Sequence, residues 1–300
     1  MIRKAFSHLI FILGLSSCSF FSSDKSQSTE GLKIEAWRAK REESLKAPYG
    51  WMSLVGLYWL KNGKSTYTVG ASSKSDVVLP ERSPQLLGHI IKEGRSYFFT
   101  PLSGETTYRG QTLSEKTEIG NDEAKDYLEF DSIRFYLIER SKGMGVRVKD
   151  PQSPTLQNFK DLKWYPFSKE FSVKAKFKPE QKELMIPDVL GGGDKEKSAG
   201  SLSFKIDGKA HTLWALESGD DLFVIFRDSS SNQGGGSYPS GRFLIVDGPI
   251  KENMTIDFNK AYNPPCAYTP WATCPLPPMQ NIFSANILAG EAYDKHNDHH

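Results

Sequence analysis

The sequence predicts a mainly β protein: a short N-terminal helix followed by two packed β domains, the first a β-sandwich and the second antiparallel. Short runs of strand-forming residues recur along the chain with turn residues between them. Aromatic residues make up 12% of the chain, and it contains 25 Gly and 17 Pro, a composition typical of folds with many strands and turns. The 300 residues, 38% of them apolar, suffice for one large domain or two modest ones.

The first 30 residues have the layout of a lipoprotein leader. Residues 1–17 combine a cationic start with a short apolar run, as in a bacterial signal peptide. The segment Leu15–Cys18 resembles the lipobox, in which the cysteine is acylated after cleavage. We therefore expect residues 1–17 to be removed, Cys18 to be lipidated and the polar residues 18–30 to form a flexible tether. The alternatives are an ordinary signal peptide with a chance cysteine, or an N-terminal core helix.

The leader also predicts a location. Several acyl chains hold a protein on a membrane far more firmly than one, and no second apolar stretch reaches the length that spans a bilayer. We expect a cell-envelope protein that Cys18 tethers to a bacterial membrane. The expected membrane is the outer membrane, with the protein facing the periplasm or the surface. The net charge of +2 gives no field that would attract nucleic acid. We predict no nucleic-acid partner and no cofactor.

Residues 31–165 are predicted to contain the helix and the first β domain. Residues 31–46 are rich in helix formers and place Ile34, Trp37 and Leu45 roughly on one side. An apolar stretch, Trp51–Leu60, comes next. Strand-like runs follow at Ser65–Val69, Val77–Leu79, His89–Lys92, Ser96–Pro101, Thr106–Tyr108, Tyr127–Phe130, Ile133–Glu139 and Gly145–Lys149.

Residues 166–292 are predicted to form the second β domain, and 293–300 a polar tail. Two glycine runs, Leu190–Asp194 and Gln233–Ser237, are expected to be flexible loops, because neither has the context of a phosphate-binding motif. The strand-like runs are Phe171–Phe177, Glu183–Ile186, Leu202–Ile206, Ala210–Ala215, Leu222–Phe226, Arg242–Val246 and Met254–Phe258.

Two cysteines remain once the lipobox has taken Cys18. Cys266 and Cys274 are eight positions apart, and in an oxidising compartment such a pair usually forms a disulfide. Free or reactive thiols and a two-cysteine metal site are the alternatives. A metal site needs more ligands than the folded part offers, so none is predicted.

The end of the chain carries the most distinctive motif. It reads Asn263-Pro264-Pro265-Cys266, then Cys274-Pro275-Leu276-Pro277-Pro278, with Ala289-Gly290-Glu291 further on. This block resembles the bacterial and archaeal family of unknown function DUF1684, and Gly50–Leu60, Arg147–Asp150 and Gly241–Leu244 are similar to other parts of that family. The resemblance covers roughly residues 35–291 and implies no activity. It departs at Ser237-Tyr238, where family members tend to have Thr-Tyr, which leaves any role of that hydroxyl open.

A second resemblance concerns residues 65–150. Gly70, Asp76–Pro80, Gly88-His89 and Tyr108–Gly110 follow the order found in forkhead-associated domains. The resemblance implies a similar β-sandwich. It does not extend to phosphothreonine binding, because Ala71 stands where those domains have the binding arginine.

The proline-rich loop Asn263–Cys274 is the candidate site. Its prolines fix the backbone and the cysteine pair would stiffen it further, which lowers the entropic cost of binding a ligand. We expect it to bind a small polar ligand. A hydrolase that uses Asp257 or Glu291 with Arg242 as an anion clamp is one alternative, and a structural envelope protein, in which these side chains brace the fold, is another. No catalytic residue can be assigned, since no nucleophile and base stand in a known motif. The candidate binding residues are Arg242, Asp257, Asn259, Tyr262, Asn263, Asn281 and Glu291.

Overall fold

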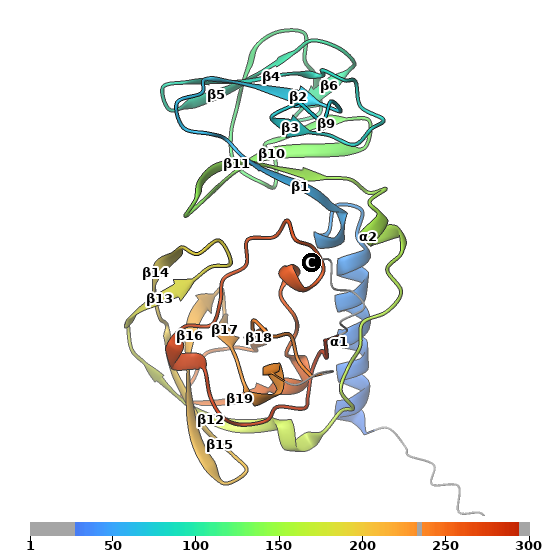
Figure 1. The fold of residues 1–300 in the computed structure, drawn as a ribbon. Coiled ribbons are helices and arrows are strands. Elements are labelled where there is room, and N and C mark those ends of the chain that lie inside the picture. The colour runs from blue at the N-terminus through green and yellow to red at the C-terminus, as the bar shows by residue number, and fades with distance from the viewer. Residues whose placement is uncertain (1–27, 233–235, 294–300) are drawn as a thin grey trace, which may run out of the picture.

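The computed structural model describes residues 28–232 and 236–293 and confirms the mainly β fold, with one N-terminal helix followed by two β regions (Figure 1). No helix of the described residues is long and apolar enough to cross a membrane. The predicted signal peptide, Cys18, nearly all of the tether, the tail after Tyr293 and part of the Gln233–Ser237 loop lie outside the described residues. Predictions about them stay predictions.

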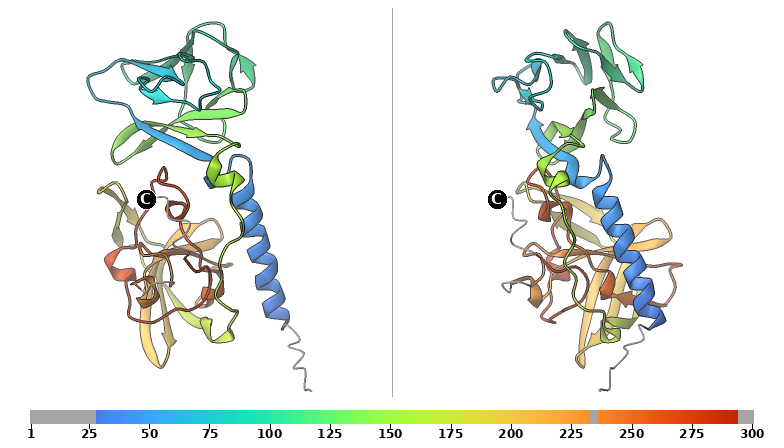
Figure 2. Two further views of the ribbon diagram at one scale, coloured as in Figure 1. Left: turned by 45° about the vertical axis from the view of Figure 1, so that its right-hand side comes forward. Right: turned by 90° about the vertical axis from the view of Figure 1, so that its right-hand side faces the viewer.

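The first β region is a sandwich of two sheets (Figure 2). The six-stranded sheet has the order β1-β11-β10-β9-β6-β7 and the five-stranded sheet the order β3-β2-β4-β5-β8. All strand pairs are antiparallel except β2 with β3. The strands are β1 (Leu54–Trp59), β2 (Thr66–Gly70), β3 (Val77–Val78), β4 (Gly88–Glu93), β5 (Ser96–Pro101), β6 (Thr106–Tyr108), β7 (Gln111–Thr112), β8 (Thr117–Ile119), β9 (Tyr127–Phe130), β10 (Ile133–Arg140) and β11 (Gly143–Lys149).

The alternation of side chains along β10 and β11 decides which of them meet the second region. Val146 and Val148 point into the sandwich and belong to its apolar core. Because successive side chains of a strand point to opposite faces, Tyr136, Arg147 and Lys149 lie on the outer face of the six-stranded sheet. In Figure 1 this sheet is the one nearer the second β region.

The second β region is built on a strongly curled antiparallel sheet of six strands, in the order β18-β17-β16-β15-β12-β19. Its concave side holds an apolar core that includes Phe204, Phe226 and Phe258. A separate hairpin, β13–β14, lies beside it. The strands are β12 (Ser172–Pro179), β13 (Glu183–Pro187), β14 (Gly193–Lys197), β15 (Gly200–Ile206), β16 (Lys209–Ser218), β17 (Asp221–Phe226), β18 (Arg242–Val246) and β19 (Asn253–Asp257).

One loop prediction in this region was wrong in part. Leu190–Asp194 was expected to be a flexible loop, but β14 begins at Gly193, and Asp194 pairs with Ile186 across the hairpin. The sequence of β14 is polar and has no apolar alternation. It becomes a strand because the backbone of β13 supplies its hydrogen bonds, which sequence periodicity does not reveal.

Helix α1 (Thr29–Lys46) packs on the second β region, not on the sandwich that follows it in sequence (Figures 1 and 2). Its Trp37 ring meets the rings of Trp164 and Tyr262 at centroid distances of 5.7 and 6.4 Å. Arg38 donates to the carbonyl of Tyr165 at 2.8 Å. The chain therefore starts on the second region, forms the sandwich, and returns through the short helix α2 (Pro154–Gln157).

Candidate functional site

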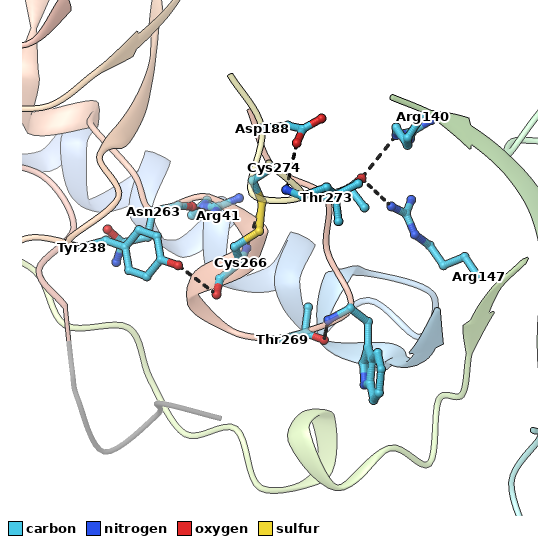
Figure 3. Close-up of a disulfide and its surroundings, with 12 residues drawn as sticks. Arg41, Arg140, Arg147, Asp188, Tyr238, Asn263, Cys266, Thr269, Thr273 and Cys274 are labelled. Atoms are coloured by element: carbon cyan, nitrogen blue, oxygen red, sulfur yellow. Dashed lines mark hydrogen bonds between the residues drawn. A yellow bond between two sulfur atoms is a disulfide. The ribbon is translucent and has the colours of Figure 1, made fainter. Parts of the chain in front are cut away.

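The Asn263–Cys274 loop is part of the packed core. The predicted disulfide joins Cys266 to Cys274, whose Cα atoms are 6.2 Å apart, and both residues are buried (Figure 3). Tyr238 donates its hydroxyl to the carbonyl of Cys266 at 3.2 Å. The stiff loop that the prolines predict is present, but most of its side chains face the protein interior.

Asn263 and Glu291, two predicted site residues, form a buried network with α1. The backbone N–H and the side-chain Nδ2 of Asn263 donate to the two oxygens of Glu291 at 3.1 and 2.9 Å. The hydroxyl of Tyr268 also donates to this carboxylate. Arg41 of α1 donates to the carbonyl of Asn263 at 3.0 Å, and its Nε lies 3.9 Å from Glu291. This network ties the helix to the last described segment of the chain.

Burial and charge oppose each other in this network. Burial raises the pKa of Glu291, although the charge of Arg41 and the hydrogen bonds from Tyr268 and Asn263 counteract the shift. Burial also raises the pKa of Tyr268 well above its ordinary value. A titratable group with a raised pKa suits acid catalysis only if a substrate can reach it.

The space beside this network is too small for a substrate. The cavity that Asn263, Tyr268 and Glu291 line has a volume of about 10 Å³, which is at most the size of one water molecule. Asn263 Oδ1 has no hydrogen-bond partner among the described residues, and a single water would satisfy it. The network is therefore built to brace the fold.

Arg242, the predicted anion clamp, is fully buried in a second network. Its guanidinium donates to Asp228 at 2.8 Å and to the carbonyls of Ala289 and Ile287 at 2.5 and 2.9 Å. Asp228 in turn accepts from two backbone N–H groups. Neither Arg242 nor Asp228 exposes any side-chain surface. The anion that Arg242 binds is therefore the protein's own Asp228.

Of the remaining predicted residues, Asp257 and Asn259 bond to each other, and Asn281 lies in a separate network. Asp257 accepts from the backbone N–H and from Nδ2 of Asn259, which bonds in turn to the backbone of Ser168. Asn281 joins β16 to β17 by bonding to the backbone of both strands. Tyr262 lies under the guanidinium of Arg41 at 4.5 Å. Of the seven predicted residues, the structure thus brings Tyr262, Asn263 and Glu291 together and leaves the others in separate networks.

The tip of the loop reaches the outer face of the sandwich. Thr273 accepts from Arg147 at 3.2 Å and from Arg140 at 3.3 Å (Figure 3). Arg147 and Lys149 lie over the ring of Trp51 at 5.3 and 5.8 Å. We refer to Trp51, Tyr136, Arg140, Arg147 and Lys149 as the cationic cluster.

Arg147 is the centre of this cluster. Its side chain is 1% exposed, and its Nε has no hydrogen-bond partner among the described residues. Among the described residues, the one carboxylate that it contacts is Glu123 at 3.2 Å. Glu123 is 37% exposed and also pairs with Arg140 at 2.7 Å. A buried guanidinium normally has all its donors satisfied. The Nε of Arg38, Arg41 and Arg242 lacks a partner among the described residues as well. What distinguishes Arg147 is that its carboxylate contact is partly exposed and shared, which leaves positive charge available to an anion.

Burial shifts the pKa values of two neighbours of Arg147. Burial lowers the pKa of Lys149 to about 8, and the charge of Arg147 adds to the shift. Burial raises the pKa of Tyr136 to about 12, with Arg147 opposing the change. Lys149 donates to the carbonyl of Tyr49 at 2.7 Å and pairs with no carboxylate of the described residues. A lysine with a pKa near neutrality beside an incompletely paired arginine is typical of functional sites.

No group of three or more His, Cys, Asp or Glu side chains in the described residues could hold a metal ion. The cationic cluster, with three positively charged side chains, is suited to an anion instead.

Sequence reasoning missed the cationic cluster although a signal for it was present. The strand Val146-Arg147-Val148-Lys149 alternates apolar and cationic residues, which places two cations on one face. That pattern alone fits an ordinary solvated sheet face. Only the packing of Thr273 and Trp51 over this strand distinguishes a candidate site from an ordinary solvated sheet face.

Residues 157–292 match the family described as "Protein of unknown function (DUF1684)". This part of the chain belongs to the DUF1684 family. The match covers the second β region, including the Asn263–Cys274 loop, and begins after the sandwich ends. No curated protein matches this chain.

One solved structure similar to this chain is the solution NMR structure of the uncharacterized protein from gene locus rrnAC0354 of Haloarcula marismortui. Its sequence is 30% identical, the match covers 46% of this chain and 79% of that one, and the TM-score is 0.38.

Proposed function

We propose that the protein is a cell-envelope lipoprotein, anchored through Cys18, that binds a small anionic ligand at the cationic cluster under the tip of the Asn263–Cys274 loop. The observation that carries this proposal is Arg147. Its guanidinium is buried almost completely, its carboxylate contact Glu123 is partly exposed and shared with Arg140, and its Nε, like that of Arg242, has no partner among the described residues. Leaving such a donor without an acceptor costs about 1–3 kcal/mol. A bound carboxylate or phosphate would remove that cost.

The balance of charge on this sheet face supports an anion. Arg134, Arg140, Arg147 and Lys149 lie on it, whereas their carboxylate partners are only Glu129, with Arg134 at 2.6 Å, and Glu123, shared by the two other arginines. The face therefore carries an excess of positive charge that the described residues do not neutralise. Partial burial strengthens the attraction of such charges for an anion, because water screens them less.

The position of the cluster and its aromatic side chains also support a ligand site. It lies where the two β regions meet, a place where binding sites are common. Trp51 is 36% exposed, so the cluster is open to solvent on that side. Its ring offers apolar surface to a sugar or other carbon skeleton. We infer a small carboxylated or phosphorylated polar molecule as the ligand.

The hydrolase alternative gains no support from the geometry. Arg242 is fully buried and already pairs with Asp228, and Glu291 is buried beside a cavity of about 10 Å³. A substrate would have to unfold the surroundings to reach either residue.

The lipid anchor is tested by mass. Mature protein extracted from membranes should carry acyl mass on Cys18, and Cys18→Ala should abolish that mass. An acyl-free wild-type protein would contradict the anchor.

The ligand site is tested by calorimetry with inorganic phosphate, citrate and glucuronic acid on the full-length protein. We expect at least one of these probes to bind, and Arg147→Met to weaken binding at least about 30-fold, because removing one partner of a buried charge pair has an effect of that size. Arg95→Met, which removes an exposed arginine from the turn between β4 and β5, is the matched control and should leave the affinity unchanged. Equal affinities of the wild type and Arg147→Met would exclude this site.

Two finer resemblances belong to the same proposal. We infer that the DUF1684 resemblance extends over residues 35–291, because α1 and the loop tip make the second β region and the sandwich parts of one packed structure. We also infer a forkhead-associated type of sandwich for residues 65–150, a proposal that the two-sheet architecture supports.

A further inference from the structure

A second positively charged feature lies on the outer face of the curled sheet. A groove of about 1340 Å³ runs over β12, β15, β16 and β19, and four lysines line it: Lys174, Lys176, Lys205 and Lys251. All four are exposed. Alternation places Lys174 and Lys176 on the side of β12 away from the core residue Ala175. We refer to these four lysines as the lysine face.

The charge of the lysine face is not neutralised within the described residues. None of the four lysines pairs with a carboxylate there, and Lys174 donates only to the hydroxyl of Thr255 at 3.3 Å. The groove contains two carboxylates, and neither pairs with one of the four lysines. Asp247 pairs with Lys260 at 2.5 Å, and Asp257 accepts from Asn259.

The lysine face lies at the end of the molecule where α1 begins. Glu30, in the first turn of α1, pairs with Lys169 at 3.3 Å, and β12 begins three residues after Lys169. Figures 1 and 2 show the start of α1 and the β15–β16 hairpin at the same end of the molecule, opposite the sandwich. Lys205 lies beside the turn of that hairpin.

The length of chain before α1 limits how far this end can be from an anchor. Cys18 and Ser28 are ten residues apart, and ten residues span at most about 36 Å. If Cys18 is acylated, the membrane surface lies within this distance of the first residue of the helix. Lysines near an anionic membrane surface are attracted to it, and each one increases the binding constant for the membrane about fivefold.

We propose that the lysine face docks on the anionic lipid headgroups of the membrane that holds the anchor. Such docking orients the molecule with the second β region at the bilayer and the sandwich away from it. The inference rests on the proposed lipid anchor, and it is independent of the ligand at the cationic cluster.

The test uses full-length acylated protein in vesicles of phosphatidylcholine alone and of phosphatidylcholine with phosphatidylglycerol. A water-soluble acetylating reagent labels exposed lysines, and mass spectrometry gives the rate at each one. We expect phosphatidylglycerol to slow labelling of the lysine face at least about fivefold, and high salt to restore it. Lys61 and Lys74, exposed on the sandwich, should label at the same rate in both vesicles. Equal rates at the lysine face in the two vesicles would overturn the proposal.

Two charge-reversal variants sharpen the test. Lys174→Glu with Lys205→Glu should abolish the protection of Lys176 and Lys251, whereas Lys61→Glu with Lys74→Glu should preserve it. Failure of the anchor is recognised separately by the missing acyl mass on Cys18. In that case the same vesicles are added to the acyl-free chain. Slower labelling of the lysine face with phosphatidylglycerol would then support docking, and equal labelling rates would overturn it.

Discussion

Two buried arginines, one in each β region, show how differently this fold treats an internal charge. Arg242 and Arg147 expose 0% and 1% of their side chains. Arg242 has a buried aspartate and two carbonyls as acceptors. Arg147 has only a hydroxyl and a share of a partly exposed glutamate. The Nε of both arginines has no partner among the described residues. Burial alone therefore does not identify a site; the number of acceptors that the protein itself provides does.

The same contrast separates the predicted site from the proposed one. Asn263 and Glu291 have the residue types of a binding site, but their polar groups are nearly all used within the protein. The cationic cluster has fewer internal partners and opens to solvent at Trp51. Four predictions test this comparison, from the largest expected effect to the smallest.

Arg242→Met should lower the free energy of unfolding by about 3–5 kcal/mol, because it leaves the fully buried Asp228 without a counter-charge. Arg147→Met should lower it by about 1 kcal/mol or less, since the partner Glu123 is partly exposed and returns to water. Urea unfolding of the two variants measures the difference. Similar decreases in the free energy of unfolding of the two variants would contradict the view that Arg242 stabilises the fold whereas Arg147 serves a ligand site.

Replacing both Cys266 and Cys274 by alanine should lower the free energy of unfolding by about 2.5 kcal/mol, because the disulfide closes a short loop and restricts the unfolded chain. If the loop tip holds the cationic cluster in place, anion binding should weaken in the same variant. Thermal unfolding and calorimetry test the two effects. Two reactive thiols in the unreduced native protein would show instead that the disulfide is absent.

Glu291→Gln should lower the free energy of unfolding by about 1–3 kcal/mol at neutral pH, because the amide group of Gln turns a donor toward the N–H of Asn263. The pKa of Glu291 is raised in the folded protein above its ordinary value of 4.5, so the unfolded chain loses its proton first as the pH rises. The contribution of Glu291 to stability is therefore largest below pH 4.5 and decreases as the pH rises through the folded pKa. Urea unfolding as a function of pH should show this decrease in the wild type and not in Glu291→Gln. A decrease of the same size in the variant would assign it to another group.

Anion binding at the cationic cluster should weaken as the pH rises through about 8, since Lys149 loses its charge there. Lys149→Arg keeps the charge at higher pH and should shift the decrease upward, while Lys149→Met should bind more weakly and without a transition near pH 8. Calorimetry with the best probe ligand over this pH range measures the effect. A wild-type affinity that is constant through pH 8 would exclude Lys149 from the site.

Local pattern determined much of the fold. The richness in helix-forming residues located α1. The period of apolar residues located nearly every longer strand, because burying one face of a strand gives its sequence a regular alternation. The proline content of the Asn263–Cys274 loop and its cysteine spacing correctly predicted a stiff, disulfide-closed segment. Strands without such a trace, such as β14 and the two-residue β7, were not predicted.

The tertiary structure decided what the polar residues do. From the sequence, Arg242 and Glu291 looked available to a ligand and Arg147 looked like an ordinary surface residue of a strand. Their roles depend on partners far along the chain: Asp228 and the carbonyls near Ile287 for Arg242, Arg41 for Glu291, and Thr273 for Arg147. Periodicity indicates which way a side chain points but not which distant group it contacts. That contact determines whether a charge is paired within the protein or is available to a ligand.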